Sequence, residues 1–134
     1  MTFVKFYLIA VLIFFLIDML WLGVIAKTLY QREIGHLMAP QFKLVPALLF
    51  YLIYIGGLVF FAILPSVETA SIKNALLCGA LFGFVAYATY DLTNFATLRG
   101  WPLKIVIYDL LWGTFISAAT AGISLKVGSY WKIF

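Results

Sequence analysis

The sequence predicts an all-α membrane protein with four transmembrane helices in an antiparallel bundle. First, 66% of the 134 residues are hydrophobic and only 10% are charged, whereas a soluble domain is about 45–50% apolar and about 25% charged. The mean hydropathy is +1.11, and so few charged side chains cannot form the polar surface of a soluble fold. Second, the apolar residues form four stretches, each reaching the roughly 20 helical residues that cross a hydrocarbon core. None shows the alternation of a membrane β-barrel strand.

The first two helices are predicted over residues 3–26 and 44–64. A lysine before an apolar run is also typical of a signal peptide, but the first stretch is too long and has no clear small-x-small cleavage motif. In the second stretch, Pro46 suits the first turn of a helix, and Pro65 ends the apolar run. Both stretches are therefore expected to span the membrane.

The other two helices are predicted over residues 72–94 and 102–126. Ser71 is placed to cap the start of the third helix. Aromatic residues flank the fourth stretch at positions 101, 130 and 131, as is typical of membrane–water interfaces. The sequence has no linker or low-complexity tract, so we expect a single domain.

The longest connection, residues 27–43, is amphipathic and predicts a short helix on the membrane surface. Four residues at helical spacing are expected to face the lipid: Tyr30, Ile34, Leu37 and Met38. The single histidine, His36, is more simply a surface residue than a ligand, and its role stays open.

The basic residues do not decide the orientation in the membrane. Four spans place both termini on one side, with four Lys/Arg there and five on the other side, so the positive-inside rule gives no answer. The net charge of +4 is spread along the flanks of the apolar stretches, so we expect no nucleic-acid partner. Cys78 is the only cysteine, which excludes an intrachain disulfide.

Three acidic residues lie inside the predicted spans: Asp18, Asp91 and Asp109. A charged group at the bilayer centre costs about 2.5–3.5 kcal/mol, so each of them requires a reason. At a rise of about 1.5 Å per residue, Asp18 and Asp109 lie roughly 11–12 Å from helix ends on the same side of the membrane. Asp91 is slightly shallower on that side. All three carboxylates can therefore share one polar pocket.

Small and polar residues follow one face of each of the last two helices. Residues on one face of a helix recur every three or four positions. The third helix has such a set in Gly79, Gly83, Tyr87, Asp91 and Asn94. The fourth helix has one in Asp109, Gly113, Ser117 and Ala121. Small residues let membrane helices approach closely. We expect four of them to pack the two helices together: Gly79, Gly83, Gly113 and Ser117.

Two similar segments, DMLWLG from Asp18 and DLLWGT from Asp109, place a tryptophan three residues after an aspartate. This echo is compatible with the inverted pseudo-symmetry of some transporters, or with coincidence in an apolar sequence. Further polar groups lie at similar depth, including Tyr54, one turn after Tyr51, and Arg99, a candidate counter-ion for Asp91. The candidate binding residues are Asp18, Trp21, Tyr54, Asp91, Asn94, Arg99, Asp109 and Trp112.

The string YATYDLTNFATLRGWP at 87–102, together with the two aspartate–tryptophan segments, resembles a family of small bacterial inner-membrane proteins of unknown function. The resemblance covers essentially the whole chain, and the D-L-T-N-x-A-T-L-x-G-W-P run is its specific motif. Matching positions are Asp18, Trp21, Gly23, Tyr90, Asp91, Thr93, Asn94, Thr97, Trp101, Asp109 and Trp112. The resemblance implies a four-helix protein in a bacterial cytoplasmic membrane, and it implies no reaction.

Three functions remain open from the sequence. The favoured one is a pocket that binds or carries a cation, a proton or an amphipathic small molecule, with a homodimer needed to enclose a path. The second is a structural subunit or assembly factor of a larger membrane complex, in which the aspartates only fix the helix packing. The third is a small membrane enzyme acting on a lipid or other hydrophobic substrate, with the carboxylates as acid and base or as ligands of a hard divalent cation such as magnesium. The absence of nucleotide-loop and nucleophile motifs disfavours this third function.

Overall fold

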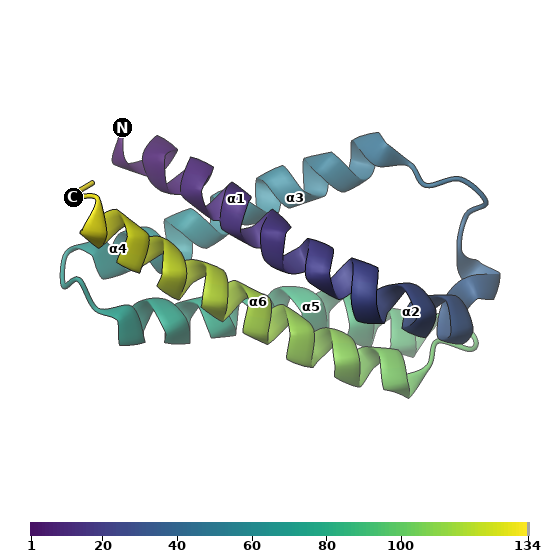
Figure 1. Cartoon of the computed structure of the whole chain (residues 1–134). Coiled ribbons are helices and arrows are strands. Elements are labelled where there is room, and N and C mark those ends of the chain that lie inside the picture. The colour runs from purple at the N-terminus through teal and green to yellow at the C-terminus, as the bar shows by residue number, and fades with distance from the viewer. Residues whose placement is uncertain (134) are drawn as a thin grey trace.

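The computed structural model describes residues 1–133 and is a bundle of four long helical segments (Figure 1). The first segment joins α1 (Thr2–Trp21), the π-helical η1 (Leu22–Ala26), α2 (Lys27–Ile34) and the short 3₁₀ turn η2 (Gly35–Leu37). The second joins α3 (Leu44–Leu58), the π-helical η3 (Val59–Ile63) and α4 (Leu64–Val67). The third and fourth are α5 (Ile72–Thr97) and α6 (Leu103–Tyr130). All four are long and apolar enough to cross a membrane, which confirms the predicted fold class.

The segments run up and down, so that both termini lie at one end of the bundle (Figure 1). The connection between α5 and α6 lies at the other end, beside α2 (Figure 1). This connection is short, and Gly100 adopts φ +74° in it, a conformation that glycine takes without a steric penalty. At the opposite end, the Ser71 side chain accepts a hydrogen bond from the backbone N–H of Asn74 at 3.1 Å. The predicted cap of the third span is thus confirmed.

α5 and α6 form the closest helix pair, because glycines remove the side chains between them. A Cβ atom built on Gly83 would lie 2.2 Å from the carbonyl oxygen of Gly113, and one on Gly79 would lie 2.7 Å from that of Ser117. A Cβ on Gly113 would meet the ring of Tyr87 at 2.2 Å. No larger residue fits at these positions without moving a helix.

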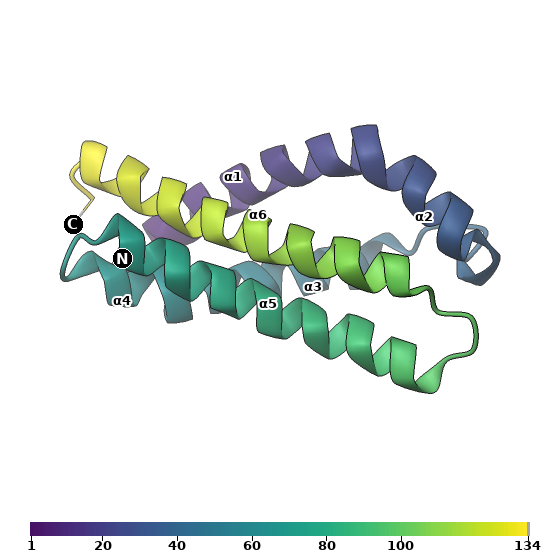
Figure 2. The same ribbon diagram turned by 90° about the horizontal axis from the view of Figure 1, so that it is seen from below.

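The first segment continues as helix beyond the predicted end of the first span. The π-helical η1 interrupts it, and Figure 2 shows α1 and α2 as one bent rod. π-helical turns are a recognised cause of such bends. The expected short helix in this connection is present as α2, but it is joined directly to α1.

α2 turns part of its apolar face toward the bundle, whereas the sequence predicted that its apolar residues face the lipid. Leu29 is buried in a small cluster with Trp101, Ile105 and Val106, and Tyr30 and Ile34 pack against this cluster. Leu37 and Met38 remain exposed. The lipid-facing expectation was therefore wrong for Tyr30 and Ile34. The bend and the π-helical turn change the direction in which α2 presents its side chains, so α2 lies over the start of α6.

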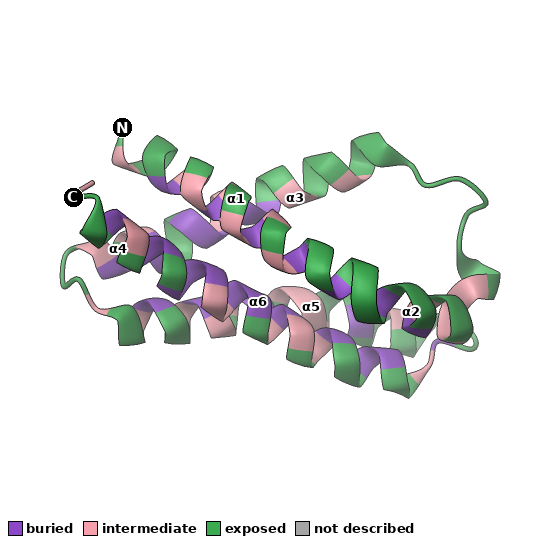
Figure 3. Cartoon of the chain, in the orientation of Figure 1, coloured by how far each residue is buried: buried purple, intermediate pink, exposed green. Residues whose placement is uncertain are grey.

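The main core lies nearer the terminal end of the bundle, where all four segments meet. It includes the fully buried side chains of Phe6, Phe14, Ile55, Leu58, Ile63, Ile116 and Leu125. The first turns of α3, by contrast, are largely exposed (Figure 3). α3 contacts α1, and only its later turns, from Tyr54, and the following η3 pack on α5 and α6. The bundle is therefore looser at the start of α3.

Candidate functional site

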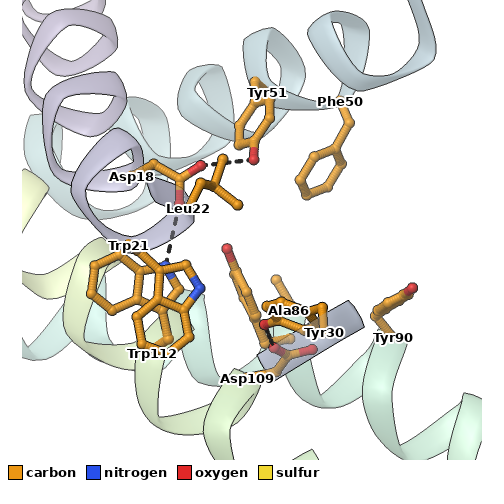
Figure 4. A pocket seen from close by; sticks show the side chains of 11 residues that line it. Asp18, Trp21, Leu22, Tyr30, Phe50, Tyr51, Ala86, Tyr90, Asp109 and Trp112 are labelled. Atoms are coloured by element: carbon orange, nitrogen blue, oxygen red, sulfur yellow. Dashed lines mark hydrogen bonds between the residues drawn. The ribbon is translucent and has the colours of Figure 1, made fainter. Parts of the chain in front are cut away.

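A cavity of about 400 Å³ lies among α1, α2, α3, α5 and α6, in this looser half of the bundle (Figure 4). Two carboxylates line it, Asp18 and Asp109. Most of the remaining lining is aromatic, consisting of Trp21, Tyr30, Phe50, Tyr51, Tyr87, Tyr90 and Trp112, and two aliphatic residues, Leu22 and Ala86, complete it. Its volume lies within the range of small-molecule sites.

Asp18 is held on α1 by two neutral donors from other helices. The Tyr51 hydroxyl on α3 donates to Oδ2 at 2.8 Å, and the Trp112 indole N–H on α6 donates to Oδ1 at 3.3 Å (Figure 4). The side chain is only 3% exposed. Asp18 therefore links three helices and also lines the cavity.

Asp109 lies on α6 and is 7% exposed. The Tyr30 hydroxyl on α2 donates a hydrogen bond to its Oδ1 (Figure 4). Within residues 1–133, no hydrogen-bond donor reaches the other oxygen, Oδ2. This oxygen is a free acceptor on a residue that lines the cavity.

The two similar sequence segments meet at this cavity. Trp21 and Trp112 stack with ring centroids 4.5 Å apart and planes inclined by 9°. Each ring follows its aspartate by one helical turn, and Trp112 also bonds to the aspartate of the other segment. The spacing that the sequence repeats thus places two carboxylates and a tryptophan pair around one space.

Neither carboxylate of the cavity has a basic partner among residues 1–133. The ion pairs found in the described part of the chain join Glu33 to Arg32 and to Lys104, at 3.5 Å and 3.6 Å. All donors to Asp18 and Asp109 are neutral side chains. Across residues 1–133, the cavity therefore has acceptors and no positive group.

Asp91 does not line the cavity, although the sequence predicted a pocket shared by all three aspartates. It is fully buried, and neither of its oxygens has a hydrogen-bond partner among the described residues. The Trp101 indole interacts with it, outside hydrogen-bond geometry. Successive helix positions are about 100° apart, so Asp91 lies to one side of Tyr87 and Tyr90 to the other. The cavity is on the Tyr90 side, and Asp91 is turned away from it.

Three other candidate residues also lie outside the cavity lining. Tyr54 is buried and hydrogen-bonded to Ser117 on α6, whereas Tyr51, one turn earlier, takes the place beside Asp18. Asn94 is half-buried. Arg99 is exposed, and it forms no ion pair with Asp91 or any other acid in residues 1–133. The cavity thus brings together Asp18, Trp21, Asp109 and Trp112 from the predicted set.

Tyr30 lines the cavity and bonds to Asp109, a position that the sequence did not indicate. Its spacing with Ile34 and Leu37 suggested a lipid-facing position. Only the π-helical turn before α2 and the docking of α2 on the start of α6 explain its bond to Asp109. The amphipathic pattern of residues 27–43 gave no sign that Tyr30 would contact Asp109.

The acidic groups of the described residues do not gather into a multi-ligand metal site. Within the described residues, no group of three or more His, Cys, Asp or Glu side chains is arranged to hold a metal. Calcium takes about six to eight oxygen ligands and magnesium keeps several waters beside one or two carboxylates, and here the two carboxylates are set among aromatic rings. The described residues therefore form no all-protein cage for a metal, and the divalent cation that the sequence allowed stays a prediction.

A family described as predicted membrane protein (DUF2177) matches residues 3–126. No curated protein and no solved structure matches the chain.

Proposed function

This chain belongs to the DUF2177 family of predicted membrane proteins, and on that premise we propose that it binds or carries a cationic or amphipathic small molecule in the cavity beside Asp18 and Asp109. The single observation that supports this is two buried carboxylates on one cavity, held only by neutral donors. The bacterial cytoplasmic membrane is proposed as its location, on the resemblance of residues 87–102.

The energetics of the membrane favour a functional role for these carboxylates. Intramembrane carboxylates are costly, and they usually pair with one another, with a basic group or with a functional ligand. A serine or asparagine could link the helices at lower cost. Two carboxylates without a basic partner within residues 1–133 are therefore better explained by a ligand that supplies the positive charge.

The cavity is also not sealed by the bundle. Phe50 and Tyr90, which line it, are 52% and 53% exposed. A small molecule can thus reach the carboxylates between α3 and α5. A carrier would need this side to close as another opens, for which a homodimer is the simplest assembly.

A structural role is the second candidate, and one observation favours it. Asp18 links α1 to α3 and α6, and Asp109 links α6 to α2. These bonds could serve to fix the bundle as a subunit of a larger complex. The two functions differ in whether the cavity binds anything.

The test uses purified protein in maltoside micelles and three probes of similar size: the cation phenyltrimethylammonium, its neutral isostere tert-butylbenzene and the anion benzoate. Ala86 lines the cavity, so Ala86→Phe fills it without changing a charge, and Ala86→Leu serves if the larger side chain prevents folding. Ala96 on the same helix is exposed, and Ala96→Phe is the matched control.

Equilibrium dialysis against empty micelles measures binding to each variant. We expect at least one probe to bind saturably to the wild type and to Ala96→Phe, and to bind at least tenfold more weakly to the cavity-filling variant. If no probe binds, or if the folded cavity-filling variant binds equally well, the cavity has no binding role and the structural role is favoured.

A further inference from the structure

The lining of the cavity indicates which kind of cation fits it. Seven aromatic residues surround two carboxylates, and none of the described residues that line the space is basic. An inorganic cation would have to keep most of its hydration water here, because a mostly aromatic lining offers few oxygens to replace it. A cation with apolar substituents has the opposite requirement, because its charge is spread over methyl or methylene groups that carry little hydration.

Aromatic faces attract such cations directly. A ligand cation within about 6 Å of a ring centroid is attracted by the ring quadrupole, and quaternary ammonium groups are recognised by cages of several rings. Tryptophan is the strongest of these rings. Trp21 and Trp112 stack on each other, and both line the cavity.

The polar groups of the lining match the same ligand. Asp109 has one oxygen without a donor in residues 1–133, and Asp18 is bonded only to neutral groups. The Tyr87 hydroxyl, also on the lining, makes no hydrogen bond within that range. A protonated amine could donate hydrogen bonds to these acceptors. A quaternary ammonium has no N–H, so its interaction with the carboxylates would be electrostatic, without a hydrogen bond.

The exposed rims at Phe50 and Tyr90 indicate how an apolar substituent is accommodated. Both residues belong to spans, on α3 and α5, so the rim they form faces the membrane and not a loop. An attached apolar group can lie between these rings and reach the lipid.

We propose that the cavity takes an organic ammonium ion with an apolar substituent, its positive charge beside Asp18 and Asp109 and its alkyl groups against the aromatic rings. This inference rests on the proposed function and names the ligand class of the same cavity. It excludes an anion and does not require a metal.

The test compares the three probes at the cavity, with the binding that Ala86→Phe abolishes taken as specific. Phenyltrimethylammonium and tert-butylbenzene have the same shape and differ in charge. We expect the cation to bind at least tenfold more tightly than its neutral isostere and no specific binding of benzoate.

Variants identify the groups that recognise the charge. Asp109→Asn is expected to weaken cation binding at least tenfold. Glu68→Gln, which removes one acidic charge at an exposed site in the connection before α5, is expected to change it less than twofold. Tyr90→Leu replaces an exposed rim ring and is expected to weaken it severalfold, which keeps the test valid if Asp109→Asn does not fold.

The outcomes separate this inference from the proposed function. If tert-butylbenzene binds the cavity as tightly as the cation, or if benzoate is preferred, the ammonium inference fails and the binding cavity stands. Unchanged cation affinity in both folded Asp109→Asn and Tyr90→Leu also overturns it. If none of the three probes binds specifically, both proposals fail.

Discussion

Trp112 on α6 stacks on Trp21 on α1, with ring centroids 4.5 Å apart, and its indole N–H bonds to Asp18 at 3.3 Å. One side chain therefore fixes both the aromatic wall of the cavity and the position of a buried carboxylate. Trp21 and Asp18 are one helical turn apart, so the contact ties two turns of α1 to α6. The stability of the helix pair should depend on it.

Replacing this tryptophan tests that dependence. Trp112→Phe keeps an aromatic ring and removes the donor to Asp18, so we expect the free energy of unfolding to fall by about 1–3 kcal/mol. Trp131→Phe alters an exposed ring near the C-terminus and is expected to be neutral. Unfolding in mixed micelles with increasing SDS measures both, and equal stability of the two variants would contradict the contact.

The hydroxyl of Tyr51 gives a finer measurement of the same site. Tyr51→Phe removes only the oxygen that donates to Asp18 at 2.8 Å, and side-chain hydrogen bonds in membrane bundles contribute about 0.5–1.5 kcal/mol. We expect a loss of this size. Tyr130→Phe, at an 82% exposed position, should change the unfolding midpoint by less than the error of the measurement. A neutral Tyr51→Phe would mean that the hydroxyl does not bond to Asp18.

The glycine contact between α5 and α6 is tested by replacing glycine with alanine at two positions. We expect the two changes to have different effects on the free energy of unfolding. At Gly83 a Cβ would lie 2.2 Å from a backbone oxygen of α6, whereas at Gly23 it would meet nothing within 4 Å. Gly83→Ala should therefore destabilise the protein by about 1–3 kcal/mol or prevent folding, and Gly23→Ala should be neutral or stabilising by up to about 1 kcal/mol. Thermal unfolding in detergent measures both variants. A Gly83→Ala variant as stable as the wild type would show that α5 and α6 are further apart than the structure places them.

The docking of α2 is tested by proteolysis. Tyr30→Phe removes the donor to Asp109, so α2 is expected to detach more often from the start of α6. Trypsin should then cut faster after Lys27 and Arg32, both of which are exposed on this segment. Tyr108→Phe, at an exposed position of α6, is the matched control. Equal cleavage of the two variants would indicate that Tyr30 does not hold α2.

Much of the fold follows from the sequence, because in a membrane the length and polarity of each stretch determine whether it spans. The caps, the antiparallel order and the glycine faces are local or periodic properties, and the structure places them as the pattern predicts. The bend at η1 was not predictable in this way. It depends on how α2 packs against Trp101 and Ile105, contacts that are distant in sequence.

The candidate site was predictable in part for the same reason. Asp18, Trp21, Asp109 and Trp112 share a spacing that the sequence displays, and all four line the cavity. Asp91 has a similar depth, but a cavity occupies only one side of a helix, and depth alone does not give that side. Tyr51 has the depth of Asp18 in the sequence and donates to it in the structure, whereas Phe50 and Tyr90 belong to the lining because α3 diverges from α5 at this end, which no local pattern encodes.

The central claim is that an organic cation binds beside the Trp21–Trp112 pair, and fluorescence quenching tests it most directly. The probe is (4-iodophenyl)trimethylammonium, whose iodine quenches indole emission at short range. We predict saturable quenching in the wild type that is lost in Ala86→Phe and at least tenfold weaker in affinity in Asp109→Asn, with Glu68→Gln unchanged. Quenching that rises linearly with probe concentration and does not saturate would contradict the account. Equal quenching in the wild type and in Ala86→Phe would contradict it as well.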